Sequence, residues 1–169
     1  EPTDLNSGIA DALDQILENK NSGARDVLVF LSGEREIFET AEFLRQLYQN
    51  QIEVLPLYSR LRVSDQEKVF TNKGSIRRVI LATNVAETSV TVPNIGYVVD
   101  PGLARVNRYS YRSKLERLPI EPISKASAEQ RKGRCGRIAP GTCYRLYDEA
   151  DFLTRPEFAD PEVQRVNLA

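Results

Sequence analysis

Val27-Leu28-Val29-Phe30-Leu31 is an unbroken apolar run that includes β-branched valines. Such a run is typical of a strand that is buried on both faces of a parallel sheet. Similar short apolar runs follow along the chain, with stretches of helical spacing between them. They span residues 54–58, 78–82, 95–99 and 142–147. Strands that alternate with helices predict an α/β fold, in which right-handed crossovers join the strands of a parallel sheet flanked by helices.

The segments between these runs show amphipathic helical spacing. Residues 1–23 predict a lead-in helix and linker, with Asp4 as the N-cap of the helix. Its apolar stripe consists of Leu5, Ile9, Leu13, Ile16 and Leu17. A second helix follows from the spacing of apolar residues between Ile37 and Tyr48. A third is predicted to open at the capping box Ser64-Asp65-Gln66-Glu67.

The segment from about 103 to 122 breaks this alternation. Charged, β-branched and aromatic residues alternate in it, which predicts a protruding antiparallel β-hairpin with a polar turn near Arg112-Ser113. On the residues alone, its arginines are explained by charge that protects an exposed strand edge.

Composition limits the class of protein. With 169 residues, 41% hydrophobic and 28% charged, the chain predicts one globular domain. No apolar run is long enough to span a membrane, so no membrane partner is expected. Two cysteines and no histidine predict free thiols in a reducing cytoplasm and no metal site.

Charge is unevenly distributed along the chain. Residues 103–137 carry ten Lys or Arg and three Asp or Glu, whereas residues 1–70 carry seven and thirteen. This segregation predicts a polyanion on one face, with an ordinary charged surface as the alternative. The net charge of −1 predicts weak nucleic-acid affinity for this piece alone.

Gln130-Arg131-Lys132-Gly133-Arg134-Cys135-Gly136-Arg137 holds the densest functional signal. On a helix, Gln130, Arg134 and Arg137 share one face, and the two glycines share a neighbouring one. The glycines favour a close backbone approach, either to the sheet or to an anion. Guanidinium forks aimed at one point suit a transferring phosphoryl group, and a solvated basic helix is the alternative.

This stretch resembles motif VI (QRxGRxGR) of the DEAH-box RNA helicases, a superfamily 2 family, in its bacterial type. Residues 82–92 resemble motif V of that family, and residues 28–34 resemble motif IV. The resemblance implies the second RecA-like lobe at 24–155, with 156–169 leading into a winged-helix domain. The chain holds neither a GxxxxGK(S/T) phosphate loop nor a DEAH tetrapeptide, so the first RecA-like lobe is expected elsewhere in the protein.

Roles at ATP follow from the resemblance. Arg134 and Arg137 correspond to arginine fingers that reach across a cleft to ATP on the first lobe. Gln130 corresponds to the glutamine that places the attacking water. Arg131 points away from this face and is interpreted as structural.

Other residues are expected to hold the nucleotide or to link it to the strand. Phe70 resembles the aromatic residue that stacks on adenine, with a place in the core as the alternative. Thr91 is expected near the nucleotide. Pro93 stands where many relatives carry an aspartate, so a ribose contact is in doubt there. Ser89 is the residue expected to couple the two sites.

Contacts with RNA are predicted at the ends of two strands. Ser32 and Gly33 follow the first strand, and Thr83 and Asn84 follow the third. Ligands of open α/β sheets gather at this edge, where short polar groups contact phosphates without reading sequence. Helix capping is the alternative for Ser32. The resemblance also implies that the hairpin lies along the nucleic acid, with Arg112 among its contacts.

The resemblance thus implies an ATP-dependent RNA helicase that uses ATP or another NTP with Mg²⁺ held by the first lobe. Its partners would be single-stranded RNA and the other domains of the same chain. Two alternatives stay open, a DNA-translocating superfamily 2 lobe and a lobe kept as a non-catalytic binding module. The RNA substrate, the direction of translocation, regulators and oligomeric state do not follow from these residues.

Overall fold

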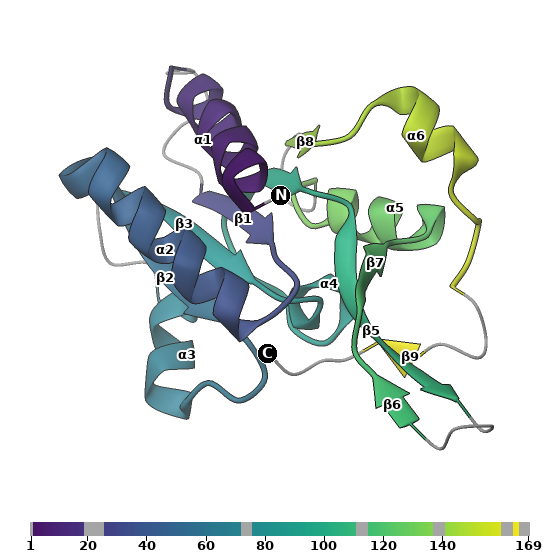
Figure 1. Ribbon diagram of the computed structural model, residues 1–169. Helices are drawn as coiled ribbons and strands as arrows, with labels where there is room; N and C mark the ends of the chain where they lie inside the picture. Colours follow the sequence, from purple (N-terminus) through teal and green to yellow (C-terminus); the bar gives the residue numbers. More distant parts are fainter. Residues whose placement is uncertain are drawn as a thin grey trace.

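A five-stranded parallel sheet lies at the centre of the molecule, with helices on both faces (Figure 1). The computed structural model describes residues 2–18, 26–71, 76–110, 115–136, 141–159 and 164–165. The helices are α1 (Pro2–Glu18), α2 (Glu34–Tyr48), a 3₁₀ turn (Gln49–Gln51), α3 (Val63–Phe70), α4 (Val85–Thr88), α5 (Lys125–Gly133) and α6 (Glu149–Thr154). The strands are β1 (Asp26–Phe30), β2 (Ile52–Leu57), β3 (Arg77–Ala82), β4 (Ile95–Asp100), β5 (Leu103–Ser110), β6 (Leu115–Arg117), β7 (Ile120–Pro122), β8 (Thr142–Arg145) and β9 (Gln164–Arg165).

The strand order is β2-β3-β1-β4-β8, and every neighbouring pair in it is parallel. β1 lies at the centre, between β3 and β4. Each crossover in such a sheet needs a connecting segment on one of its faces, which explains the alternation of strands and helices along the chain. The predicted α/β fold is therefore confirmed.

Side chains of β1 point alternately to two hydrophobic cores. Val27 and Val29 join the core under α1 and α2. Leu28 and Phe30 join the core on the other face, which α3, α4 and the end of α5 cover. All five residues of β1 are buried, as the unbroken apolar run predicts for Val27 to Phe30 and as it does not predict for Asp26.

Two helix starts differ from the predictions. α1 begins at Pro2, so Asp4 lies inside the helix and is not its N-cap. A proline suits this first position because its fixed φ and missing N–H cost nothing there. The predicted capping box is also wrong, since α3 begins at Val63 and its N-cap is Arg62. Asp65 instead pairs with Arg62, at 3.5 Å.

The apolar stripe of α1 is confirmed. Ile9, Leu13 and Ile16 are fully buried in the first core, and Leu5 and Leu17 pack against it. α1 therefore contributes to the same core as the central sheet.

The predicted hairpin forms, but the strand that returns along β5 is divided into two, β6 and β7. β5 pairs antiparallel with both β6 and β7, and β6 projects away from the central sheet (Figure 1). β9, which the sequence did not predict, pairs with β5 through Val106 and Asn107. The predicted turn at Arg112-Ser113 lies outside the described residues.

Neither cysteine forms a disulfide, as predicted: Cys135 is buried and Cys143 half-buried. Burial, and to a lesser degree the charge of Asp100, raises the pKa of Cys143 to about 12. Within the described residues, no group of three or more potential metal ligands gathers. No helix in that part of the chain is both long and apolar enough to cross a bilayer.

Candidate functional site

The carboxyl ends of β1 and β3 bring four predicted residues together. The N–H of Leu31 donates to the carbonyl of Ala82 at 2.7 Å, which holds the ends of these two strands side by side. Ser32 and Gly33 follow one strand end, and Thr83 and Asn84 follow the other. The structure therefore places these four residues at one edge of the sheet, where the sequence predicted them.

Thr83 and Asn84 are buried, with 1% and 6% of their surface exposed. The hydroxyl of Thr83 and the side-chain oxygen of Asn84 have no hydrogen-bond partner among the described residues. Most buried polar atoms are paired, so two unpaired atoms at adjacent positions indicate capacity for a ligand.

Ser32 and Gly33 lead into α2. Gly33 is the N-cap of this helix, and no side chain caps it. Ser32 is therefore not its N-cap, contrary to the capping alternative. Ser32 instead lines an open pocket of about 390 Å³ beside α2 and the base of the hairpin. Leu103 and Ile120 from the hairpin also line this pocket.

α5 carries the predicted catalytic residues but is shorter than expected. Ser124 caps its start by accepting a hydrogen bond from the N–H of Ser127, and the helix ends at Gly133. Arg134 is the C-cap, so the prediction that one helix continues from Gln130 through Arg134 is wrong. A glycine near a helix end favours termination. Arg137 lies outside the described residues.

Gln130 and Arg134 still lie close together at this helix end. Nε of Arg134 donates to the backbone carbonyl of Gln130 at 3.3 Å. Gln130 is exposed and Arg134 half-buried. A side chain at Gly133 or Gly136 would meet no atom within 4 Å, so neither glycine serves a close approach to the sheet.

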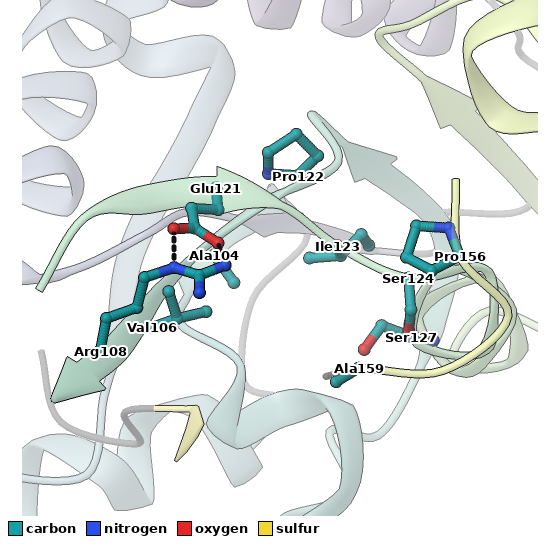
Figure 2. Close-up of a pocket in the computed structure, with 10 residues that line it drawn as sticks. All are labelled: Ala104, Val106, Arg108, Glu121, Pro122, Ile123, Ser124, Ser127, Pro156 and Ala159. Atoms are coloured by element: carbon teal, nitrogen blue, oxygen red, sulfur yellow. Dashed lines mark hydrogen bonds and ion pairs between the residues drawn. The ribbon is translucent and has the colours of Figure 1, made fainter. Parts of the chain in front are cut away.

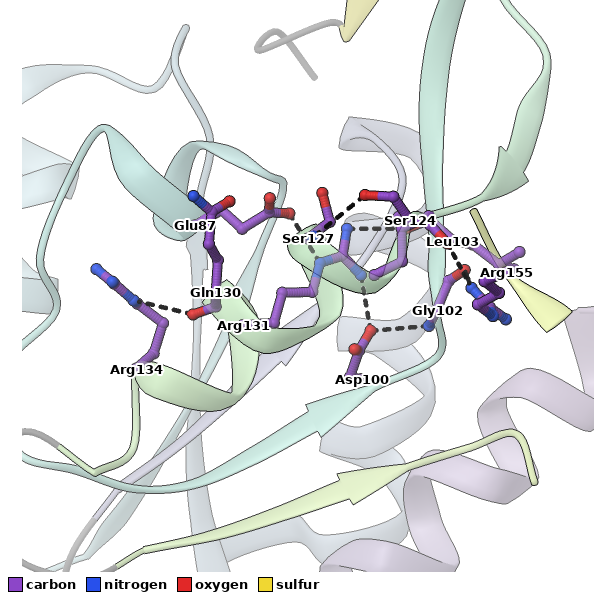
Figure 3. A network of polar contacts seen from close by, with 11 residues as sticks. Glu87, Asp100, Gly102, Leu103, Ser124, Ser127, Gln130, Arg131, Arg134 and Arg155 are labelled. Atoms are coloured by element: carbon purple, nitrogen blue, oxygen red, sulfur yellow. Dashed lines mark hydrogen bonds and ion pairs between the residues drawn. The ribbon is translucent and has the colours of Figure 1, made fainter. Parts of the chain in front are cut away.

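Arg131 forms the most buried polar network of the described residues (Figure 3). Its Nε donates to Glu87 at 2.9 Å, and its Nη1 donates to Asp100 at 2.8 Å. Its Nη2 donates to the carbonyl of Leu103 at 3.0 Å. The guanidinium also lies over the ring of Phe30, 4.7 Å from its centre. The structural interpretation of Arg131 is confirmed.

This network joins four elements of the lobe. Glu87 belongs to α4, Asp100 ends β4, Leu103 begins β5 and Arg131 belongs to α5. Neither acidic residue was singled out from the sequence. Two features of the sequence could have indicated this network. Asp100 is a single acidic residue directly after the apolar run 95–99, and Arg131 does not lie on the predicted face of its helix.

Phe70 and Thr91 lie near the opposite edge of the sheet, where strands begin. Phe70 ends α3, and 41% of it is exposed. The core position in this turn belongs to Val69, which is fully buried, so the core alternative for Phe70 does not hold. Thr91 is exposed and precedes the start of β4.

The end of α5 reaches this same edge. A side chain on Gly141, just before β8, would lie 2.1 Å from the carbonyl oxygen of Cys135. Cys135 therefore passes directly beside the start of β8, and the neighbouring Arg134 lies at the edge where Phe70 and Thr91 are found. Among the described residues, those predicted for nucleotide and those predicted at the two strand ends for RNA thus lie at opposite edges of one sheet.

Two of the hairpin arginines are engaged within the protein. Arg105 pairs with Glu36 of α2 at 3.4 Å. Arg108 of β5 forms an ion pair with Glu121 of β7, beside a small pocket near the start of α5 (Figure 2). The Arg108 pair therefore stabilises the hairpin itself, and the Arg105 pair joins the hairpin to α2. Arg112 lies outside the described residues.

The parallel sheet of order β2-β3-β1-β4-β8 has the architecture of the RecA-like C-terminal lobe of helicases. A family model described as "Helicase conserved C-terminal domain" matches residues 8–139. The crystal structure of the DExH-box NTPase HrpB of E. coli superposes with a TM-score of 0.83 at 35% identity. That match covers 91% of this chain and 19% of the HrpB chain.

Curated relatives agree with this match. ATP-dependent RNA helicase HrpA of Escherichia coli (strain K12) is 59% identical over 161 residues. Its homolog in Haemophilus influenzae is 57% identical over 162 residues. These alignments cover 95% and 96% of this chain, which spans 12% of the length of each relative. The probable ATP-dependent RNA helicase DHX34 of Mus musculus is 50% identical over 147 residues, 85% of this chain and 13% of that protein.

The chain belongs to the helicase conserved C-terminal domain family, and its sequence is similar to the corresponding region of DEAH-box RNA helicases.

Proposed function

We propose that this chain is the second RecA-like lobe of an enzyme that uses ATP to unwind or remodel RNA. In this proposal a preceding lobe holds ATP and Mg²⁺, and Arg134, Arg137 and Gln130 complete the catalytic site. The opposite edge of the sheet holds single-stranded RNA. The observation that carries the proposal is the separation of the two predicted sets of residues to opposite edges of one parallel sheet.

The chemistry of the nucleotide edge fits a polyphosphate. Arg134 offers a planar guanidinium, which pairs well with phosphate oxygens. It is fixed near Gln130 by the turn that ends α5. The exposed ring of Phe70 can stack on a base, and stacking discriminates poorly among nucleotides.

The chemistry of the RNA edge fits a sugar–phosphate backbone. The unpaired hydroxyl of Thr83 can donate to a phosphate oxygen, and the unpaired side-chain oxygen of Asn84 can accept from a ribose 2′-hydroxyl. The acceptor favours RNA over DNA, because deoxyribose lacks that donor. The pocket beside Ser32 extends this edge toward the hairpin.

A lobe replacement tests the proposal. The 161 aligned residues of E. coli HrpA are replaced by the matching residues of this chain. We expect the chimera to hydrolyse ATP in the presence of Mg²⁺, and single-stranded RNA to stimulate it more than DNA of the same sequence. The matched control is the same chimera with Arg134→Ala, which should bind RNA and hydrolyse little ATP.

A chimera that binds RNA without hydrolysing ATP would favour the binding-module alternative. Equal stimulation by DNA would favour a DNA translocase. The isolated chain should hydrolyse no ATP, so Mg²⁺-dependent turnover by the pure chain would contradict the assignment as a second lobe.

A further inference from the structure

A buried ion pair lies where β1 and β3 begin. Asp26 and Arg78 are each 2% exposed, and their strands run side by side. Nε of Arg78 donates to Oδ2 of Asp26 at 3.2 Å, and its backbone N–H donates to Oδ1 at 2.9 Å. A buried ion pair is weak evidence for stability, since desolvation offsets much of the attraction. The other groups to which these two side chains form hydrogen bonds are therefore more informative about the role of the pair.

Arg78 holds the end of α3. Its Nη1 donates to the carbonyls of Lys68 at 2.7 Å and Thr71 at 3.1 Å, and its Nη2 donates to the carbonyl of Val69 at 3.1 Å. The last carbonyls of a helix lack partners within it, and a cation is favourable at this end. The guanidinium thus fixes the backbone on both sides of Phe70.

Asp26 holds the loop that follows Thr91. Its Oδ2 accepts a hydrogen bond from Nδ2 of Asn94 at 3.3 Å, and its N–H donates to the carbonyl of Asn94 at 2.9 Å. Asn94 has a positive φ of 62°, which asparagine and glycine tolerate best. Val92, which lies between Thr91 and Asn94, is buried in the core. The backbone after Thr91 is therefore anchored at Val92 and at Asn94.

We propose that the Asp26–Arg78 pair positions the two nucleotide contacts relative to each other, Phe70 through Arg78 and Thr91 through Asn94. The inference rests on the proposed nucleotide-binding role of those two residues. Neither Asp26 nor Arg78 is a catalytic residue, because each acts through another residue. The pair should therefore set the affinity for the nucleotide and leave the rate of phosphoryl transfer to Arg134 and Arg137.

The central test is Arg78→Lys in an enzyme that carries both lobes. Lysine keeps the charge opposite Asp26, but its single nitrogen cannot span three carbonyls and a carboxylate. We expect KM for ATP to rise about tenfold, equivalent to about 1.4 kcal/mol, with kcat changed less than about twofold. The matched control is Arg77→Lys, the adjacent position of β3, whose guanidinium lies over Tyr97. It should leave KM unchanged.

A double-mutant cycle tests the route of the effect. In a Phe70→Ala background, Arg78→Lys should raise KM less than it does alone, because its effect passes in part through Phe70. A fall in kcat at constant KM, in proportion to the fraction folded in a urea titration, would show a purely structural role and overturn the proposal. An unchanged KM would overturn it as well.

A second variant covers the case in which Arg78→Lys does not fold. Asn94→Gly keeps the positive φ and removes only the side-chain bond to Asp26. It should raise KM about threefold, and an unchanged KM overturns the proposal. If Phe70→Ala and Thr91→Ala leave KM unchanged, the nucleotide-site assignment itself fails. If they raise KM while Arg78→Lys and Asn94→Gly do not, only this inference fails.

Discussion

Arg131 donates from its Nε to Oε2 of Glu87 across 2.9 Å, and both side chains are sealed from solvent. This bond ties α5 to α4, and the same guanidinium also holds Asp100. We expect Arg131→Ala to lower the free energy of unfolding of this chain by about 3–5 kcal/mol, because it leaves two buried carboxylates without their cation. Urea titration followed by circular dichroism measures the change.

Lys132→Ala is the matched control, since this neighbour is exposed and should change stability by less than about 0.5 kcal/mol. If Arg131→Ala lowers the free energy of unfolding by as little as Lys132→Ala does, the prediction is wrong, and water must solvate Glu87 and Asp100 in the Arg131 variant.

Arg134→Ala, in an enzyme with both lobes, should reduce the rate of ATP hydrolysis by roughly 10³- to 10⁵-fold, the range found for arginine fingers. Arg137→Ala should act in the same direction. Binding of single-stranded RNA should change little, because Arg134 lies at the edge of the sheet opposite Thr83 and Asn84. Lys132→Ala again serves as the control, and equal losses at all three positions would indicate a general basic surface.

Ser89→Ala should reduce RNA unwinding per ATP more than it reduces hydrolysis. Ser89 is the C-cap of α4 and is exposed, midway along a segment that starts at Thr83 and ends at the start of β4. This segment joins the two edges, and coupling between two ligands requires an element that responds to both. Hydrolysis and strand displacement are measured on the same sample. A proportional fall of both, or no change in either, would leave Ser89 as a turn residue only.

Cys143 should react slowly with alkylating agents. Its pKa is about 12 in the folded chain, against 9.0 for an ordinary thiol, so folding favours the protonated form. In a Cys135→Ala background at about pH 8.5, iodoacetamide should label the native chain roughly 500- to 1,000-fold more slowly than the chain in urea, which is the ratio of the two thiolate fractions. The same shift means that stability is unaffected below about pH 9 and falls as the pH rises from there toward 12. Equal labelling rates in the two states would show that the thiol is accessible and unperturbed.

The sequence predicted the sheet well because burial on both faces leaves a local signature. Val27 to Leu31 needs no knowledge of its neighbours to be identified as a central strand. The shared position of Ser32, Gly33, Thr83 and Asn84 was predicted for a different reason, because residues that follow parallel strands must lie at one edge of the sheet. Phe70 was distinguished from a core residue only in the structure, because helical spacing alone does not show which of two adjacent apolar residues faces the sheet.

Features that depend on distant residues were missed. Glu87 and Asp100 lie 44 and 31 positions from Arg131, and no local pattern announces such pairs. The same holds for Asp26 and Arg78, which are 52 positions apart. The end of α5 at Gly133 was missed for a different reason. The shared face of Gln130, Arg134 and Arg137 assumed an unbroken helix, although the glycines in that stretch already disfavoured one.

The length of the strands sets a fixed spacing between the two edges of this sheet. β1 has five residues and β3 and β4 six each, which corresponds to about 17–20 Å at ~3.3 Å per residue. Strands buried on both faces do not stretch or shorten. The sheet therefore keeps the residues assigned to ATP at a fixed distance from those assigned to RNA. In the proposed enzyme the lobe cannot pull RNA toward ATP by deforming its own strands. Any power stroke of that enzyme must move the whole lobe as one body against its neighbours.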